Sequence, residues 1–372
     1  MTKAAKAMVP SQRYDIKLLF AVLFLVGIGI VMVYSASSAL ALKKFGSDFY
    51  FLKKQALFSL IGIVALVMFT HIPYRIYRSL TYPLLFTALG LLLAVQFSGL
   101  GLSAGGSLRW LKLGPVTFQP VEVARLALIV FMAYSLNKKH ESLQNFGIGF
   151  VPHVILLLVF AVPLLLQPDF GSVVIFGALV WMMMFVAGVP LRHLMTALIL
   201  LLPPAYFLMI NATYRIKRLI SFLDPWQYPA DEGYQIIHSL MAFGTGGIWG
   251  AGIGKGYQKL FYLPEPHTDF IFAVIGEELG FWGVLFILAL YAIVIWRGTR
   301  IAYRSEDNFG MLMAAGITMA IALQVSINMG VALGLLPTKG LTLPFLSYGG
   351  TSLLLNMACI GILMNIGAKY AN

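Results

Sequence analysis

Asp269 is the residue of this sequence whose position best suits proton-transfer chemistry. It follows a polar, proline-containing stretch, 263–268, and directly precedes the apolar run that begins with Phe270. This pattern predicts a carboxylate at the outer mouth of a membrane helix. Such a carboxylate can cap the helix by accepting backbone N–H bonds, which contributes about 1 kcal/mol. It can also act as a general base, because the helix dipole favours its ionised form while partial burial raises its basicity.

Glu122 and Arg125 form a second candidate group, one helical turn apart and just after Pro120. Residues at this spacing share a helix face and can pair. Charges inside a membrane span are costly, so they usually face the bundle interior or a cavity and have partners there. The pair is therefore either a structural ion pair or part of a cavity wall that positions a ligand or the base.

Basic residues in the outer segments form a third group, comprising Arg215, Arg218 and Lys339. A cationic face at a membrane surface often contacts anionic lipid headgroups. Guanidinium groups also grip phosphate in a bidentate manner, and a departing diphosphate needs such neutralisation. Both interpretations predict an anionic partner for these side chains.

Two further acidic residues, Glu277 and Glu278, lie between Gly276 and Gly280. This glycine spacing favours close helix packing, so the two carboxylates can simply pair within the bundle. The glycine cluster of 244–256 has neither the GxGxxG register nor the spacing of a P-loop, so a flexible loop is a better interpretation than a nucleotide site.

The composition indicates an integral membrane protein, because 60% of the 372 residues are hydrophobic and only 11% are charged. Its single cysteine, Cys359, excludes an intramolecular disulfide. We predict one all-α membrane domain, 1–372, of about ten transmembrane helices. The predicted spans are 16–36, 52–70, 80–99, 120–136, 150–167, 171–188, 192–210, 270–296, 309–332 and 350–368.

The net charge of +12 has to be interpreted in this membrane context. The basic residues lie between the spans, which favours anionic lipid or a lipid phosphate, and not nucleic acid, as the partner. Over the short loops, Lys and Arg are more frequent on the side of the termini, which predicts cytoplasmic N- and C-termini. The first apolar run is too long for the hydrophobic region of a signal peptide, so we interpret it as a retained span.

Three outer segments are too polar to face lipid and too apolar for ordinary loops: 100–119, 211–269 and 333–349. Irregular backbone near membrane depth occurs only where it is buried in protein or lines a wet cavity. We therefore expect these segments to roof one outward-facing cavity. Within the large extracytoplasmic loop 211–269, residues 234–243 predict a re-entrant or interfacial half-helix that is too short to span.

Seven ordered strings along nearly the whole chain resemble the SEDS family of peptidoglycan polymerases. The Pro-Thr-Lys-Gly form of the last string is more similar to the division branch of the family than to its elongation branch. The strings are Arg109-Trp110 through Gly114-Pro115, Gln119-Pro120-x-Glu122, Gln167-Pro168-Asp169-Phe170-Gly171, Phe222 to Trp226, Glu265-x-His267-Thr268-Asp269-Phe270-Ile271-Phe272, Gly276-Glu277-Glu278-Leu279-Gly280, and Leu336-Pro337-Thr338-Lys339-Gly340 through Ser347-Tyr348-Gly349-Gly350.

The resemblance implies an enzyme of the bacterial cytoplasmic membrane that polymerises lipid II and releases undecaprenyl pyrophosphate during cell division. It places the family's essential acidic residue at Asp269, and by the same strings it suggests substrate-binding roles for Glu265, His267 and Ser347. It also implies a class B penicillin-binding protein and other divisome proteins as partners. In two places the chain departs from the family: Arg125 stands where lysine is frequent, and Phe261 stands where some division members have an acidic residue.

These observations lead to one preferred mechanism and two alternatives. In the preferred mechanism, Asp269 accepts the proton of an attacking sugar hydroxyl, and Arg215, Arg218, Lys339 or a divalent cation, Mg²⁺ or Mn²⁺, neutralises the departing diphosphate. The first alternative is a transporter or flippase of lipid-linked precursors, for which the carboxylates within the spans would also suit. The second is a non-catalytic scaffold for a division partner.

Overall fold

A bundle of long apolar helices makes up the computed structural model, which describes residues 14–104, 107–114, 116–210, 217, 220–230, 233–260 and 262–368. Eight helices in this part of the chain are long and apolar enough to cross a membrane, and α6 and α7 add two shorter apolar stretches. The prediction of an all-helical bundle with about ten spans is therefore confirmed. The long helices are α1 (Ile16–Phe45), α2 (Tyr50–His71), α3 (Ile76–Phe97), α4 (Pro120–Lys138), α5 (Val151–Leu166), α6 (Phe170–Ala187), α7 (Leu191–Ile210), α10 (Ile271–Arg304), α11 (Asn308–Ala332) and α12 (Gly350–Ala368).

Local sequence sets several helix ends. The Asp15 carboxylate accepts a hydrogen bond from the Leu18 backbone N–H at the start of α1 (3.1 Å), and α1 ends at Gly46 in the left-handed conformation. Asp169 caps α6 in the same way, and Gly188 ends it. A π-helical turn, Phe146–Phe150, leads into α5, and single 3-10 turns form at His140–Ser142 and Pro225–Gln227.

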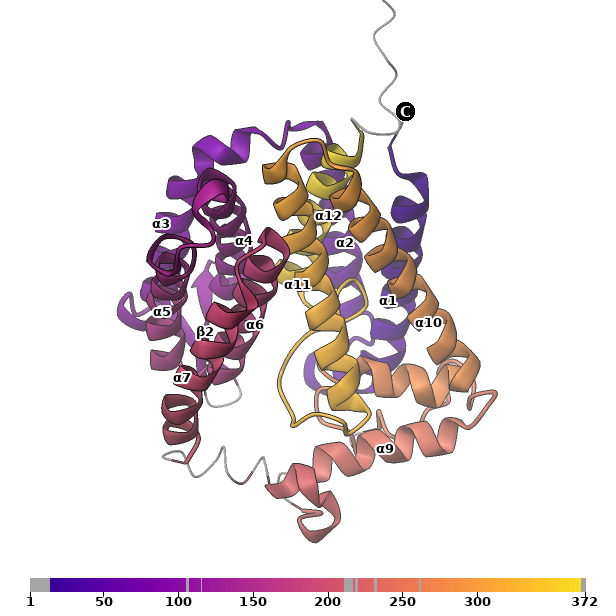
Figure 1. Cartoon of the computed structure of the whole chain (residues 1–372). Helices are drawn as coiled ribbons and strands as arrows, with labels where there is room; N and C mark the ends of the chain where they lie inside the picture. Colours follow the sequence, from indigo (N-terminus) through magenta and orange to yellow (C-terminus); the bar gives the residue numbers. More distant parts are fainter. Residues whose placement is uncertain are drawn as a thin grey trace, which may run out of the picture.

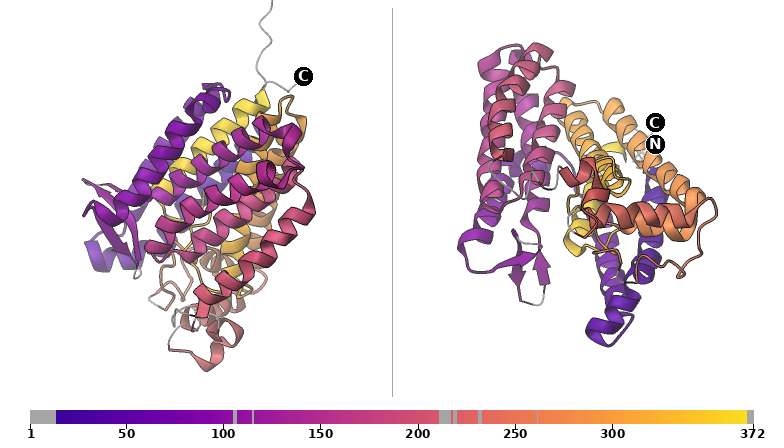
Figure 2. Two further views of the ribbon diagram at one scale, coloured as in Figure 1. Left: turned by 60° about the vertical axis from the view of Figure 1, so that its left-hand side comes forward. Right: turned by 90° about the horizontal axis from the view of Figure 1, so that it is seen from below.

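The helices gather in two groups that meet along α11 (Figures 1 and 2). Helices α3 to α7 lie together, while α1, α2, α10 and α12 lie on the other side of α11. Helix α11 packs against α4 and α6 of the first group and against α10 and α12 of the second. The start of α1 and the end of α12 lie at one end of the bundle, and α9 (Tyr234–Gly246) lies at the opposite end (Figure 1).

Helix α10, which contains the predicted span 270–296, is broken at Gly280. Gly280 has φ 65° and ψ −164°, a conformation that side chains disfavour, so Ile271–Arg304 consists of a short first segment and a long second one. The first segment lies beside α9, and the ribbon turns sharply before the long segment runs back along the bundle (Figure 1). Glu277 and Glu278 therefore lie in the short segment before the break.

Residues 101–104, 107–113 and 116–118 form a small antiparallel sheet where the sequence predicted irregular backbone. The strand order is β1 (Gly101–Ala104), β2 (Ser107–Leu113) and β3 (Val116–Phe118). In the register, Gly101 pairs with Leu111 and Lys112 pairs with Thr117. The strands are short and include a register shift after Leu102, which hides the alternation that normally identifies a strand.

The predicted half-helix is present as α9, and the glycine-rich segment that follows it adopts a fixed path. Gly247, Gly250, Gly252 and Gly254 all have positive φ, which explains the glycine requirement. The segment hydrogen-bonds to the first part of α10, through Ala251 N–H to the Glu277 carbonyl and Gly252 N–H to the Glu278 carbonyl. These hydrogen bonds attach the glycine-rich segment to α10.

Candidate active site

Asp269 lies in a tight turn immediately before α10. Glu265 has φ 50°, and its backbone carbonyl accepts hydrogen bonds from the N–H groups of Thr268 and Phe270. The helix cap is Phe270 and has no side-chain hydrogen bond, so the predicted capping role of Asp269 is wrong. The Asn328 side-chain amide donates to the backbone carbonyl of Asp269 (2.9 Å) and so fixes the backbone at this position. The carboxylate is thus positioned but not used as a cap.

The surroundings of Asp269 make it a stronger base than an ordinary aspartate. Burial, followed by the negative charge of Glu265, raises the pKa of Asp269 to about 7, although the positive charge of Arg109 lowers it. A carboxylate with that pKa exchanges protons readily near neutral pH. It therefore meets the chemical requirement for a general base.

The segment between α11 and α12 brings Gly340 to Asp269, and it brings the preceding residue, Lys339, to the start of α6. At Gly340, a Cβ atom would lie 3.0 Å from the Asp269 Oδ2 atom, so the two residues are in close contact. The Lys339 ammonium is buried, and it has no hydrogen-bond partner among the described residues. Burial lowers the pKa of Lys339 to about 8, while the nearby carboxylates of Asp169 and Glu122 raise it. A buried cation without a hydrogen-bond partner indicates an anionic ligand.

Lys339 reaches this position because residue 171 has no side chain. A Cβ atom at Gly171 would lie 2.3 Å from Lys339 Cε and 2.8 Å from Lys339 Nζ. We therefore expect Gly171→Ala to displace the ammonium and lower the turnover number about tenfold, while the helix keeps its stability because alanine favours helix.

The control for this change lies on the same helix. At Gly177 a Cβ atom would make only an ordinary contact, 3.8 Å from Leu157 Cδ2. Turnover and thermal unfolding of both variants check the prediction. Equal turnover in Gly171→Ala and Gly177→Ala would contradict it.

Arg109, on β2, supplies a second cation that the sequence did not single out. Its Nη2 atom donates to the Pro168 carbonyl (3.3 Å) and lies 3.6 Å from the Asp169 carboxylate. Its Nε atom is buried with no hydrogen-bond partner in the described ranges. Its charge acts on both Asp269 and Lys339. In the sequence, Arg109 stood out only as part of the Arg109-Trp110 string, with no role of its own, because the sheet that carries it was not predicted.

Glu122 and Arg125 form the predicted ion pair on α4. The guanidinium also donates to Gln324 of α11 and to Asn356 of α12 (3.3 Å for the latter). Gln324 in turn donates to the Thr342 carbonyl (2.9 Å), three residues beyond Lys339. The pair thus connects three helices to the segment that carries Lys339. The sequence did not single out Gln324, Asn328 and Asn356 because only charged residues within the spans were weighed.

Ser347 and His267 support the turn from its other side. The Ser347 hydroxyl donates to the Thr268 carbonyl (2.6 Å) and accepts from the Leu343 N–H (2.7 Å), so it fixes the backbone next to Asp269. His267 is buried and its ring packs against Phe51, with 4.5 Å between the centroids. Burial lowers the pKa of His267 to about 4, so the ring is neutral at physiological pH. These contacts place both residues behind the turn, and Glu265 is exposed on its outer side.

Other candidates have different outcomes. Arg215, Arg218 and Phe261 lie outside the described residues. Within the described ranges, no three His, Cys, Asp or Glu side chains lie close enough to hold a metal ion.

Glu277 accepts hydrogen bonds from the N–H groups of Tyr257 (2.7 Å) and Gln258 (3.2 Å). Its carboxylate therefore has a structural role.

The sequence and the fold of this chain are similar to those of known proteins. The family model of the cell cycle proteins FtsW, RodA and SpoVE matches residues 16–372. The chain is 45% identical to the probable peptidoglycan glycosyltransferase FtsW of Geobacter metallireducens, over 96% of each chain. A second similar protein is one chain of a solved peptidoglycan synthase complex, in a study of the structural coordination of polymerization and crosslinking. Its TM-score with this chain is 0.80 at 30% sequence identity, and the match covers 96% of this chain and 99% of that chain. The crystal structure of RodA from Thermus thermophilus has TM-score 0.69 and 29% identity, covering 99% and 100%.

Proposed function

Since the chain belongs to the family of the cell cycle proteins FtsW, RodA and SpoVE, we propose that it is a peptidoglycan glycosyltransferase that polymerises lipid II at the outer face of the cytoplasmic membrane during cell division. The observation that carries this proposal is a basic carboxylate, Asp269, together with two incompletely paired cations: Arg109, whose charge acts on Asp269, and Lys339, which directly precedes the residue that contacts Asp269. A base and a diphosphate-binding pair are the two groups that this reaction needs.

The proposed step is an inverting displacement at an anomeric carbon. A sugar hydroxyl of the acceptor lipid II attacks the anomeric carbon of the lipid-linked growing chain, and Asp269 accepts its proton. The new glycosidic bond forms as the bond to the diphosphate oxygen breaks, and undecaprenyl pyrophosphate leaves with the electron pair. Lys339 and Arg109 stabilise the negative charge that develops on that oxygen.

A divalent cation would fit the site only together with substrate. Mg²⁺ is usually held by one or two carboxylates and substrate phosphates. The diphosphate would supply most of the ligand oxygens, since no three His, Cys, Asp or Glu side chains of the described residues lie close enough to hold the ion alone. When bound, such an ion would add to the neutralisation of the leaving group.

The dependence of turnover on pH follows from these two side chains. Asp269 must be ionised, so activity rises with pH through its raised pKa of about 7. Lys339 must be protonated, so activity falls as pH passes its lowered pKa of about 8. We therefore expect a narrow optimum between these values, measured as initial polymerisation rates at constant ionic strength.

Lys339→Arg is the matched variant for the alkaline side of the profile. Because a guanidinium stays charged at this pH, the alkaline fall should move upward or disappear while the acid rise stays in place. A profile that is flat between about pH 6 and 9 would contradict the assignment of both groups.

We also propose the location and partners of the enzyme. Ten spans bring the start of α1 and the end of α12 to one side, which we assign to the cytoplasm of a bacterium, and the candidate site to the outer side. The related synthase complex supports a class B penicillin-binding protein as the crosslinking partner, with other division proteins around the pair.

The proposal is tested with the full chain purified in detergent and given lipid II. Detergent micelles have no second aqueous compartment, so glycan strands in the product demonstrate catalysis and exclude transport alone. An inactive chain that carries lipid II across liposomes would overturn the proposal. Repeating the assay with EDTA, and then with added Mg²⁺ or Mn²⁺, tests the divalent cation.

A further inference from the structure

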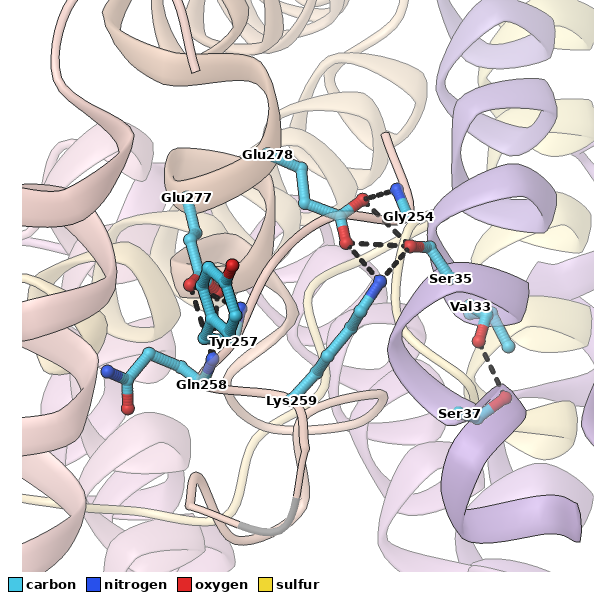
Figure 3. A network of polar contacts seen from close by, with 9 residues as sticks. All are labelled: Val33, Ser35, Ser37, Gly254, Tyr257, Gln258, Lys259, Glu277 and Glu278. Atoms are coloured by element: carbon cyan, nitrogen blue, oxygen red, sulfur yellow. Dashed lines mark hydrogen bonds and ion pairs between the residues drawn. The ribbon is translucent and has the colours of Figure 1, made fainter. Parts of the chain in front are cut away.

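A buried ion pair lies outside the site described so far (Figure 3). The Lys259 ammonium donates to Glu278 Oε1 (2.5 Å) and to the Ser35 hydroxyl (2.8 Å), and Ser35 donates to the same carboxylate (2.7 Å). The Gly254 N–H donates to the other carboxylate oxygen (3.0 Å). The side chains of Lys259 and Glu278 are 6% and 0% exposed. Burying two charges costs much of their hydration free energy, and this cost can cancel the attraction between them. The ion pair is therefore not explained by a gain in folding stability alone.

The carboxylate of the neighbouring residue, Glu277, holds the backbone just before Lys259. Glu277 accepts the N–H groups of Tyr257 and Gln258, which directly precede Lys259. The backbone passes so close that a Cβ atom at Gly256 would lie 2.7 Å from Glu277 Oε2. Two adjacent carboxylates of α10 therefore hold the glycine-rich segment, and Lys259 and Ser35 extend this attachment to α1 (Figure 3).

The position of Asp269 relative to this pair gives the contact a consequence for function. Lys259 and Glu278 are 19 residues apart in sequence, and Asp269 lies near the middle of the segment that they close. Closing a segment at its ends lowers the number of conformations open to the residues between them. A catalytic group is effective only when its position is held within a fraction of an ångström.

We propose that Lys259 is a positioning residue, and that its ion pair with Glu278 and Ser35 is a clasp that holds the turn of Asp269 in its reactive place. This inference rests on the proposed polymerase function. We expect the ion pair to affect the rate of the chemical step and not the binding of substrate. Lys259 is buried against α1 and α10 and is not one of the cations of the candidate site.

Lys259→Met tests the clasp, with Lys255→Met as control because Lys255 is an exposed lysine on the same segment. We expect Lys259→Met to lower the turnover number at least tenfold, with the Michaelis constant for lipid II within about twofold of wild type, and Lys255→Met to resemble wild type. Lys259→Arg retains the charge and should recover part of the turnover.

Variants without an unpaired buried charge separate positioning from folding. Ser35→Ala removes only the bridging hydroxyl, and Lys259→Met with Glu278→Gln removes both charges. Each is purified as folded protein, and turnover is expressed per folded molecule. We expect a severalfold loss for Ser35→Ala and a tenfold or greater loss for the double variant, even where its thermal unfolding matches wild type.

The outcomes distinguish the two proposals. Wild-type turnover per folded molecule in Lys259→Met, or in the double variant if the single one fails to fold, would overturn the clasp and leave the polymerase assignment intact. An inactive wild-type chain under the same conditions would instead refute the polymerase function. Equal changes in turnover and Michaelis constant for Lys259→Met and Lys255→Met would also count against the clasp.

Discussion

Asp269→Asn is expected to lower the polymerisation rate by a factor of about 10³, with the chain still folded and inserted. Asparagine has nearly the same shape but cannot accept the proton of the attacking hydroxyl, and a general base typically contributes 10² to 10⁴ in rate. The backbone should not change, because Asn328 bonds to the carbonyl of residue 269 and not to its carboxylate. The measurement is glycan product formed from purified lipid II over time.

A carboxylate on the same turn supplies the control for Asp269. Glu265 is exposed, and among the described residues its carboxylate accepts a hydrogen bond from the Thr268 hydroxyl alone (3.2 Å). We expect Glu265→Gln to keep its rate within about threefold of wild type, with the acid limb of the pH profile moved to lower pH because a negative charge near Asp269 is lost. Polymerisation by Asp269→Asn at a rate near that of wild type would rule out Asp269 as the base.

Lys339→Met is expected to reduce turnover by about 10² to 10³, which is the usual effect of removing one group that stabilises developing negative charge. Methionine keeps most of the length of the side chain and removes the ammonium. Because that ammonium is buried and has no hydrogen-bond partner among the described residues, its removal should leave the thermal unfolding temperature unchanged or raise it. Lower activity together with equal or higher stability is typical of a residue retained for function.

Lys112→Met is the matched control, since Lys112 is an exposed lysine on the strand that carries Arg109. Its turnover should be close to that of wild type at physiological ionic strength. If Lys339→Met unfolds at a lower temperature and keeps its turnover, Lys339 is structural and the leaving-group assignment is wrong.

The helices could be predicted from the sequence because continuous apolar length is a strong signal of a membrane span. The break in α10 could not be predicted, because apolar residues occur on both sides of Gly280 and a single glycine is tolerated in many helices. The break is caused by a tertiary contact. The backbone of Gly250 approaches Gly280 so closely that a Cβ atom at residue 280 would lie 2.3 Å from the Gly250 nitrogen.

The candidate site was predictable only in its charged members. Asp269 was identified because the chain has only 14 acidic residues and this one adjoins an apolar run. Arg109 and Asp169 come from separate outer segments, and only the folded sheet and the start of α6 bring them to Lys339. Lys259 was missed for the same reason, since its partners Ser35 and Glu278 lie 224 and 19 residues away.

The polar contacts of α4 have a consequence for how the chain is made. Among the eight candidate spans α4 has the lowest mean hydropathy, 1.3, and it carries the Glu122–Arg125 pair. The amides that complete this pair, Gln324 and Asn356, follow Arg125 by 199 and 231 residues. During synthesis α4 therefore leaves the ribosome long before its polar partners exist. In a nascent chain that stops before α11, α4 should be only weakly integrated in the bilayer. Its stable integration should require the synthesis of α11 and α12, which carry Gln324 and Asn356.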